Sequence, residues 1–178
     1  IVRPGTGNDA RLENDVTING NLTITSGVTM DTRSGANTYN ITIKGNWENQ
    51  GDFEERTSTV IFNGSGVQSI FKGGPSYGET FYSLTINKPS GDVTLTGDDI
   101  TVTNLLALTN GDIVLGSTNL IIGNTGTTSG ASISSYVQAD GSGVMKKNYN
   151  AAPVTFAYPV GDVDDYSPFS ISGLNSAT

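Results

Sequence analysis

The amino-acid sequence predicts an all-β protein: a short parallel β-solenoid with irregular rungs, followed by a small antiparallel β segment. Apolar-x-apolar triplets recur along the chain, and this period-two alternation is typical of half-buried strands. Gly, Asn and Asp separate the triplets, with 23 Gly among 178 residues, and these residue types form tight turns. No segment keeps a 3.6-residue apolar period over helical length, so almost no helix is expected.

The triplets predict the strands one by one, and taken three at a time they recur about every 20 residues. They are Val16–Ile18, Leu22–Ile24, Val28–Met30, Ile41–Ile43, Val60–Phe62, Leu84–Ile86, Val93–Leu95, Ile100–Val102, Leu106–Leu108, Ile113–Leu115 and Leu120–Ile122. A fixed period of this kind indicates stacked rungs, because one rung cannot bury its own apolar face. The same phase places Trp47 and Phe53 in the core.

The composition changes along the chain and predicts three parts. Residues 1–15 are charged and rich in turn formers, which suits an N-terminal cap over open strand edges. Residues 16–140 carry the solenoid rungs. Residues 141–178 contain longer strands with aromatic residues, and they are either an antiparallel β tail or the start of a following β-sandwich domain. A charge cluster is expected on a protruding loop; it comprises Glu48, Asp52, Glu54, Glu55 and Arg56.

Charge and residue usage exclude several classes of function. The chain has 9 basic and 17 acidic residues, a net charge of -8, which opposes binding to nucleic acid. No apolar run reaches the roughly 18 residues that predict a membrane helix, so membrane insertion is not expected. The sequence has neither His nor Cys, which removes the commonest general base, nucleophile and zinc ligands. A non-enzymatic protein is therefore predicted.

Two acidic groups are candidates for chemistry. Asp98 and Asp99 could act as an acid-base pair on a sugar, but a corner between two strands explains them more simply. Asp162, Asp164 and Asp165 have a spacing from which carboxylate oxygens could converge on calcium, the alternative being an ordinary solvated turn. Calcium is the only cofactor that the sequence suggests.

Two further sets of residues are candidates for binding. Tyr77 lies in a Gly-rich loop, and together with Tyr82 it is the best candidate for a glycan contact. Ser167, Phe169 and Ile171 lie in the C-terminal strand pattern and could form an edge for assembly. Open solenoid ends and an incomplete β tail both leave unpaired strand edges, so end-to-end or strand-exchange contact with a second copy is a further possibility.

Several strings resemble the repeat region of very large surface and secreted proteins of Bacteroidota. They are Thr80–Asn87, Leu108–Gly116, Tyr158–Gly161 and Tyr166–Pro168. Those proteins are filamentous-haemagglutinin-like β-helices that are exported by the type IX system. The resemblance covers the chain from about residue 41 to residue 171. It implies an extracellular or outer-surface location and a role in adhesion or matrix building, and it carries over no catalytic residue.

These observations together predict a non-enzymatic structural module of an extracellular or cell-surface bacterial protein. It would serve as an adhesin stalk or as a filament or matrix subunit, with itself or surface glycans as partners. The alternative is a carbohydrate-binding module of a secreted protein. Exposed aromatic residues beside an acidic loop would favour the alternative, whereas charges clustered on one outer face would favour an enzyme.

Overall fold

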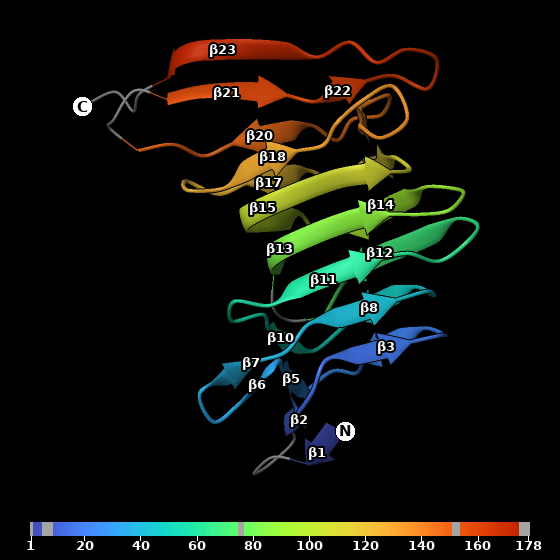
Figure 1. Ribbon diagram of the computed structural model, residues 1–178, viewed down its shortest axis with the longest axis vertical. Coiled ribbons are helices and arrows are strands. Elements are labelled where there is room, and N and C mark those ends of the chain that lie inside the picture. Colours follow the sequence, from blue (N-terminus) through green and yellow to red (C-terminus); the bar gives the residue numbers. More distant parts are fainter. Residues whose placement is uncertain (1, 5–8, 75–76, 151–153, 175–178) are drawn as a thin grey trace.

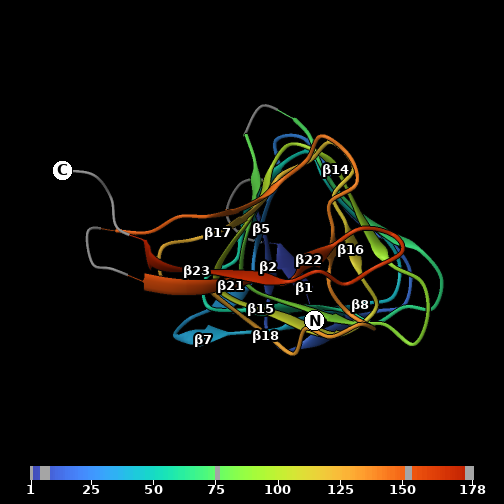
Figure 2. The same cartoon turned by 90° about the horizontal axis from the view of Figure 1, so that it is seen from above.

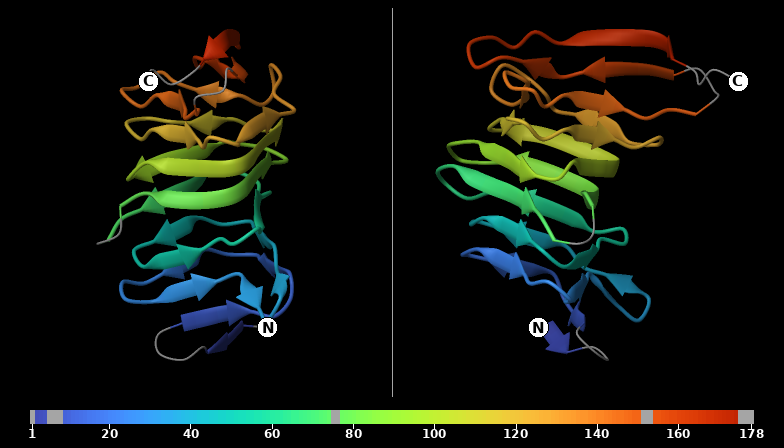
Figure 3. Two further views of the ribbon diagram at one scale, coloured as in Figure 1. Left: turned by 90° about the vertical axis from the view of Figure 1, so that its left-hand side faces the viewer. Right: turned by 180° about the vertical axis from the view of Figure 1, so that it is seen from behind.

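The computed structural model describes residues 2–4, 9–74, 77–150 and 154–174. These residues form strands and turns with no helix, and the predicted fold class is confirmed. About six turns of chain stack along one axis (Figures 1 and 3). Seen along that axis, the turns superpose into a rough triangle, so the solenoid has three faces (Figure 2).

Face one begins each turn, and two of its strands continue around a corner into the next face. Its strands are β2 (Asp9–Leu12), β5 (Thr29–Asp31), β10 (Asp52–Glu54), the starts of β13 (Glu79–Asn87) and β15 (Ile100–Asn110), β17 (Leu120–Ile122) and β20 (Met145–Lys147). Face two contains β3 (Val16–Ile18), β8 (Ile41–Ile43), β11 (Thr59–Phe62), the second halves of β13 and β15, and β18 (Thr127–Ser129).

Face three is a sheet of seven parallel strands. They are β4 (Leu22–Ile24), β9 (Trp47–Asn49), β12 (Gln68–Lys72), β14 (Val93–Gly97), β16 (Ile113–Val114), β19 (Val137–Gln138) and β22 (Val160–Gly161). In-register pairing stacks each inward side chain on its counterpart in the next turn. Ile41, Val60, Leu84 and Leu106 form one such column, and all four are buried.

The two ends of the solenoid differ from the predicted boundaries. β2 already pairs in parallel with β5, so the first rung begins inside the expected N-terminal cap, and only β1 (Val2–Pro4) pairs antiparallel there. At the other end β20 and β22 pair in parallel with β17 and β19, so stacking continues past residue 140. The small antiparallel sheet consists of β21 (Val154–Tyr158) and β23 (Phe169–Leu174).

Asn and Asp side chains tie successive turns together at the corners. Each of these residues stands just before a strand, and its Oδ1 accepts from the backbone N–H of a residue one turn further along, 19 to 25 residues away. At one corner Asn46 accepts from Ser69 (3.0 Å), and its own N–H donates to Asn21 (2.9 Å). Asp92, Asp112 and Tyr136 form an equivalent series. Corner N–H groups are thus paired along the axis.

The corner series predicts a measurable cost for Asp112→Ala. Asp112 Oδ1 accepts from Tyr136 N (2.9 Å), and its Oδ2 accepts from the side-chain amide of Gln138 (2.7 Å). Both donors belong to buried residues, so the variant should lose roughly 1–3 kcal/mol of unfolding free energy. Chemical denaturation measures this loss. The exposed Thr109 provides the control: a Thr109→Ala variant with an equal loss would contradict the corner-bond explanation.

Candidate functional site

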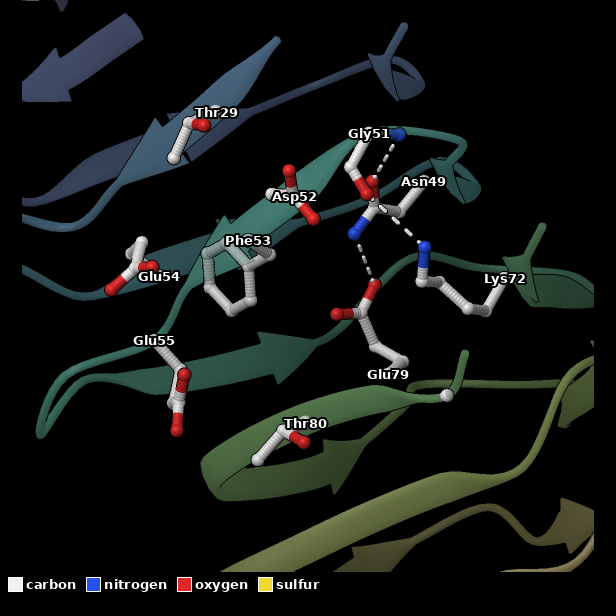
Figure 4. A pocket seen from close by; sticks show the side chains of 11 residues that line it. Thr29, Asn49, Gly51, Asp52, Phe53, Glu54, Glu55, Lys72, Glu79 and Thr80 are labelled. Atoms are coloured by element: carbon white, nitrogen blue, oxygen red, sulfur yellow. Dashed lines mark hydrogen bonds between the residues drawn. The ribbon is translucent and has the colours of Figure 1, made fainter. Parts of the chain in front are cut away.

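Face one is interrupted between β10 and the start of β13. These two segments belong to different sheets, and a cleft of about 260 Å³ opens at the break (Figure 4). β10 forms one wall, so the acidic cluster is not on a protruding loop as predicted: Asp52–Glu54 is a strand. Residues 52–54 alternate polar, apolar and polar around Phe53, and this alternation explains why the segment forms a strand. The segment that projects from the rungs is the short hairpin of β6 (Arg33–Ser34) and β7 (Asn37–Thr38).

Glu79 is the central group of the cleft. It begins β13 with its side chain on the inward phase, and only 2% of the residue is exposed. Its Oε2 accepts hydrogen bonds from Trp47 Nε1 (2.9 Å) and Asn49 Nδ2 (2.8 Å). Burial raises the pKa of Glu79 from 4.5 to about 7, although both hydrogen bonds and the charge of Lys72 oppose the shift. The carboxyl group can therefore exchange a proton near neutral pH.

Lys72 and Asn49 lie beside Glu79 and are also buried. Lys72 Nζ donates to the backbone oxygens of Gly51 (3.1 Å) and Gly73 (2.8 Å). Asn49 Oδ1 accepts from the N–H of Gly51 (2.9 Å), while its Nδ2 faces Glu79. Figure 4 shows the amine of Lys72 pointing toward Asn49 and Gly51, and the carboxyl group of Glu79 lying next to the amide nitrogen of Asn49.

Three aromatic rings pack against one another beside the cleft, and one of them, Phe53, lines it. Trp47 packs edge-on against Phe53 and Phe81, with ring centroids 4.8 and 5.3 Å apart, and the centroids of Phe53 and Phe81 are 6.0 Å apart. Trp47 and Phe53 thus pack in the core as predicted. These rings exclude water from the Glu79 carboxyl group, which is the physical cause of its raised pKa.

The outer part of the cleft is acidic. Asp52, Glu54 and Glu55 line it, and partial burial raises the pKa of Glu55. Arg56 donates to both carboxylate oxygens of Asp31 (3.1 and 3.2 Å) and forms an ion pair with Glu54 at 3.1 Å. The site therefore places a protonatable carboxyl group in contact with a carboxamide, with a buried amine on the neighbouring strand and acidic groups at the entrance.

The structure separates the two predicted glycan contacts. Tyr77 is 94% exposed and lines a shallow groove of about 460 Å³ with Asp98, Asp99 and Thr101. Tyr82 lies on β13 where the strand turns from face one to face two, at the register shift between Phe81 and Ser83. The two tyrosines flank opposite ends of the same face, so they do not form one platform.

The acidic candidates are occupied by structural hydrogen bonds. Asp99 stands at a corner, as predicted, and accepts from the backbone and side chain of Asn119. Asp162 Oδ1 accepts from the N–H groups of Asp164 (2.9 Å) and Asp165 (2.8 Å), an arrangement that closes a turn. Within the described part of the chain, no three His, Cys, Asp or Glu residues are grouped so that they could hold a metal ion.

The proposed assembly edge lies at the C-terminal end. Phe169 and Ile171 are on β23 and are 49% and 37% exposed, and Phe169 stacks on Tyr158 with centroids 4.7 Å apart. Ser167 precedes the strand; its N–H donates to Val160 and its hydroxyl to Asp165. These residues are exposed, as an assembly edge requires.

Sequence reasoning missed Asn49, Lys72 and Glu79. Each carries a polar side chain on the inward phase of a strand, beside Trp47, Ile70 and Phe81 respectively. The inward phase of these polar residues was the signal in the sequence that could have revealed them, since a charged residue at a core position requires a buried partner. Which residues are neighbours across turns depends on the register, and irregular turn lengths hide the register from the sequence.

Comparison with protein-family models, curated proteins and solved structures finds no match for this chain. In the described residues no helix is long and apolar enough to span a bilayer. Assignment of a role therefore depends on the sequence patterns and on the geometry described above.

The raised pKa of Glu79 makes stability depend on pH. The folded protein holds this proton more tightly than the unfolded chain, where the ordinary value of 4.5 applies. The stabilisation is therefore fully present below pH 4.5 and is lost as the pH rises through about 7. We expect the contribution of Glu79 to the free energy of unfolding to fall by up to about 3 kcal/mol across this window.

Urea titrations between pH 4 and pH 8 check this expectation. The Glu79→Gln variant keeps a hydrogen-bond acceptor but cannot titrate, so the difference in unfolding free energy from the native protein should change with pH. Glu48→Gln is the matched control, because Glu48 lies between inward-pointing Trp47 and Asn49 and therefore on the outer side of β9. An unchanged pH slope in Glu79→Gln would refute the assignment.

Proposed function

We propose that this chain is a non-enzymatic structural module of an extracellular or cell-surface bacterial protein, acting as a stiff segment of an adhesin stalk or of a filament. The observation that carries the proposal is the uninterrupted axial pairing of face three, from β4 to β22. Seven strands bonded in one direction resist bending along the axis. The corner hydrogen bonds and the apolar columns also join successive turns along this axis.

The distribution of charge supports a structural role. Outward strand positions are mostly Thr, Ser and Ala, and the net charge is -8, which keeps a surface module soluble and away from anionic polymers. The cleft at the break of face one directs its buried carboxyl group toward Trp47 and Asn49. The resemblance to surface and secreted Bacteroidota β-helices supports an outer-surface location.

Contact with a second copy is a further part of the proposal. At the N-terminal end the first rung leaves an apolar hollow of about 200 Å³, lined by partly exposed Val16, Ile18 and Leu22. At the C-terminal end Phe169 and Ile171 are exposed. Both ends carry apolar surface and strand edges, which suits end-to-end association.

Light scattering after size-exclusion chromatography tests the association. We expect the molar mass of the native chain to rise with concentration, and a Phe169→Lys, Ile171→Lys double variant to remain monomeric because lysine disfavours edge contact. A matched control places lysine at the exposed Val67, away from both ends. A native chain that stays monomeric at every concentration, also in electron micrographs, would remove the filament role and leave the stalk.

Exchange of the module within its parent protein tests the stalk role. If the chain is a spacer, replacing it with an unrelated solenoid of equal length should leave cell adhesion unchanged, whereas deleting it should reduce adhesion by shortening the reach. Antibody labelling of intact cells checks surface exposure in the same experiment.

The carbohydrate-binding alternative predicts the opposite result. It is favoured by the exposed Tyr77 beside Asp98 and Asp99. Adhesion would then be lost in the exchanged protein, and binding on a glycan array would fall roughly tenfold in Tyr77→Ala, the equivalent of one lost aromatic contact. Tyr82→Ala is the control, because Tyr82 lies at the other end of the face.

A further inference from the structure

Lys72 and Asn49 are direct cross-strand partners. β12 pairs with β9 in parallel, and the register places Lys72 opposite Asn49. Directly paired residues have their Cα atoms about 5 Å apart and point to the same side of the sheet. Here that side is the interior, since Lys72 is 2% exposed and Asn49 is fully buried. An amine and a carboxamide are thus enclosed together (Figure 4).

The carboxamide of Asn49 is held as an acyl donor would be. Its carbonyl oxygen accepts from the Gly51 N–H at 2.9 Å, which draws electron density from the carbonyl carbon. Its nitrogen lies 2.8 Å from Glu79 Oε2. A protonatable carboxyl group therefore contacts the atom that would have to leave as ammonia.

The surroundings favour the uncharged form of Glu79. Trp47, Phe53 and Phe81 pack against one another at this position, and burial of Glu79 beside Trp47 disfavours its charged form. The raised pKa of Glu79 agrees with this. A neutral amine has two N–H bonds and one lone pair; the backbone oxygens of Gly51 and Gly73 accept the two N–H bonds, which leaves the lone pair for attack.

We propose that Lys72 and Asn49 are joined by an intramolecular isopeptide bond, formed spontaneously with Glu79 as the proton carrier. The Lys72 Nζ lone pair attacks Asn49 Cγ, and a C–N bond forms. Glu79 delivers one proton to Asn49 Nδ2 as the Cγ–Nδ2 bond breaks, and it takes one proton from the attacking nitrogen, so it ends in the protonated form in which it began. The products are a secondary amide and one ammonia, so the atoms balance and no oxidant or other co-reactant is required.

A second lysine of the chain provides an internal comparison. Lys88 Nζ donates to the carboxamide oxygen of Gln68 at 2.6 Å, so it too combines a buried amine with a carboxamide. The described contacts of the Gln68 carboxamide are with backbone groups of Ile43, Gly45 and Gly64 and with Lys88, and none is with a carboxyl group. Without a proton carrier, this pair should remain unlinked.

Mass spectrometry of the purified full chain tests the proposal. We expect the intact mass to be lower than the sequence mass by one ammonia, no tryptic cleavage after Lys72, and a branched peptide that links Lys72 to Asn49. Lys72→Arg and Glu79→Gln should restore the full sequence mass. Asn49→Asp should still form the bond but lose one water instead of one ammonia, which distinguishes the chemistry from misfolding.

Two controls make the result decisive. Lys88→Arg should keep the ammonia deficit, because the described contacts of the Gln68 carboxamide include no carboxyl group that could protonate its leaving nitrogen. Asn-Gly sequences such as Asn63-Gly64 can also lose ammonia by forming a cyclic imide, so the site must be mapped by peptide fragmentation. A native chain of full sequence mass that trypsin cuts after Lys72 would overturn the proposal, as would a deficit that persists in Lys72→Arg. The outcome does not depend on the stalk or filament role.

Discussion

The structure depends on axial stacking, in which each turn of chain is buried only by the turns on either side of it. A single turn of three short strands leaves its apolar side chains open to water along the axis. Register therefore matters more than the strength of any one strand, because a one-residue slip would turn each inward column outward. The column Ile41, Val60, Leu84 and Leu106 shows the register that results.

The same geometry explains why lysines are buried in this core. Where the chain turns a corner, backbone carbonyl oxygens point inward and require donors. Lys72, Lys88 and Lys147 supply them: Lys147 Nζ, for example, donates to the backbone oxygens of Gly123, Asn124 and Gly126. A long side chain with several N–H bonds fills a corner that an apolar residue could not satisfy, so the interior of this solenoid is partly polar by necessity.

Much of the fold was predictable from the sequence, and little of the cleft was. Triplets such as Leu84–Ile86 revealed strand phase, and turn residues such as Asp99 marked corners, because both signals are local. The ends of the stack do not coincide with the expected boundaries near residues 15 and 140, since β2 and β20 join the stack through pairing with distant strands. The contact among Asn49, Lys72 and Glu79 spans three successive turns, and local patterns carry no information about which positions become neighbours.

The interruption of face one has a consequence for how the molecule opens. The interaction free energy between adjacent turns is the sum of the strand pairing on three faces. Between β10 and β13 the pairing on face one is missing. In a quasi-one-dimensional array, the weakest interface separates cooperative units. The first three turns and the remaining turns should therefore exchange their amide protons as two blocks, with the earliest opening at this junction. A covalent link between β9 and β12 would lie within the first block and strengthen it without closing the junction.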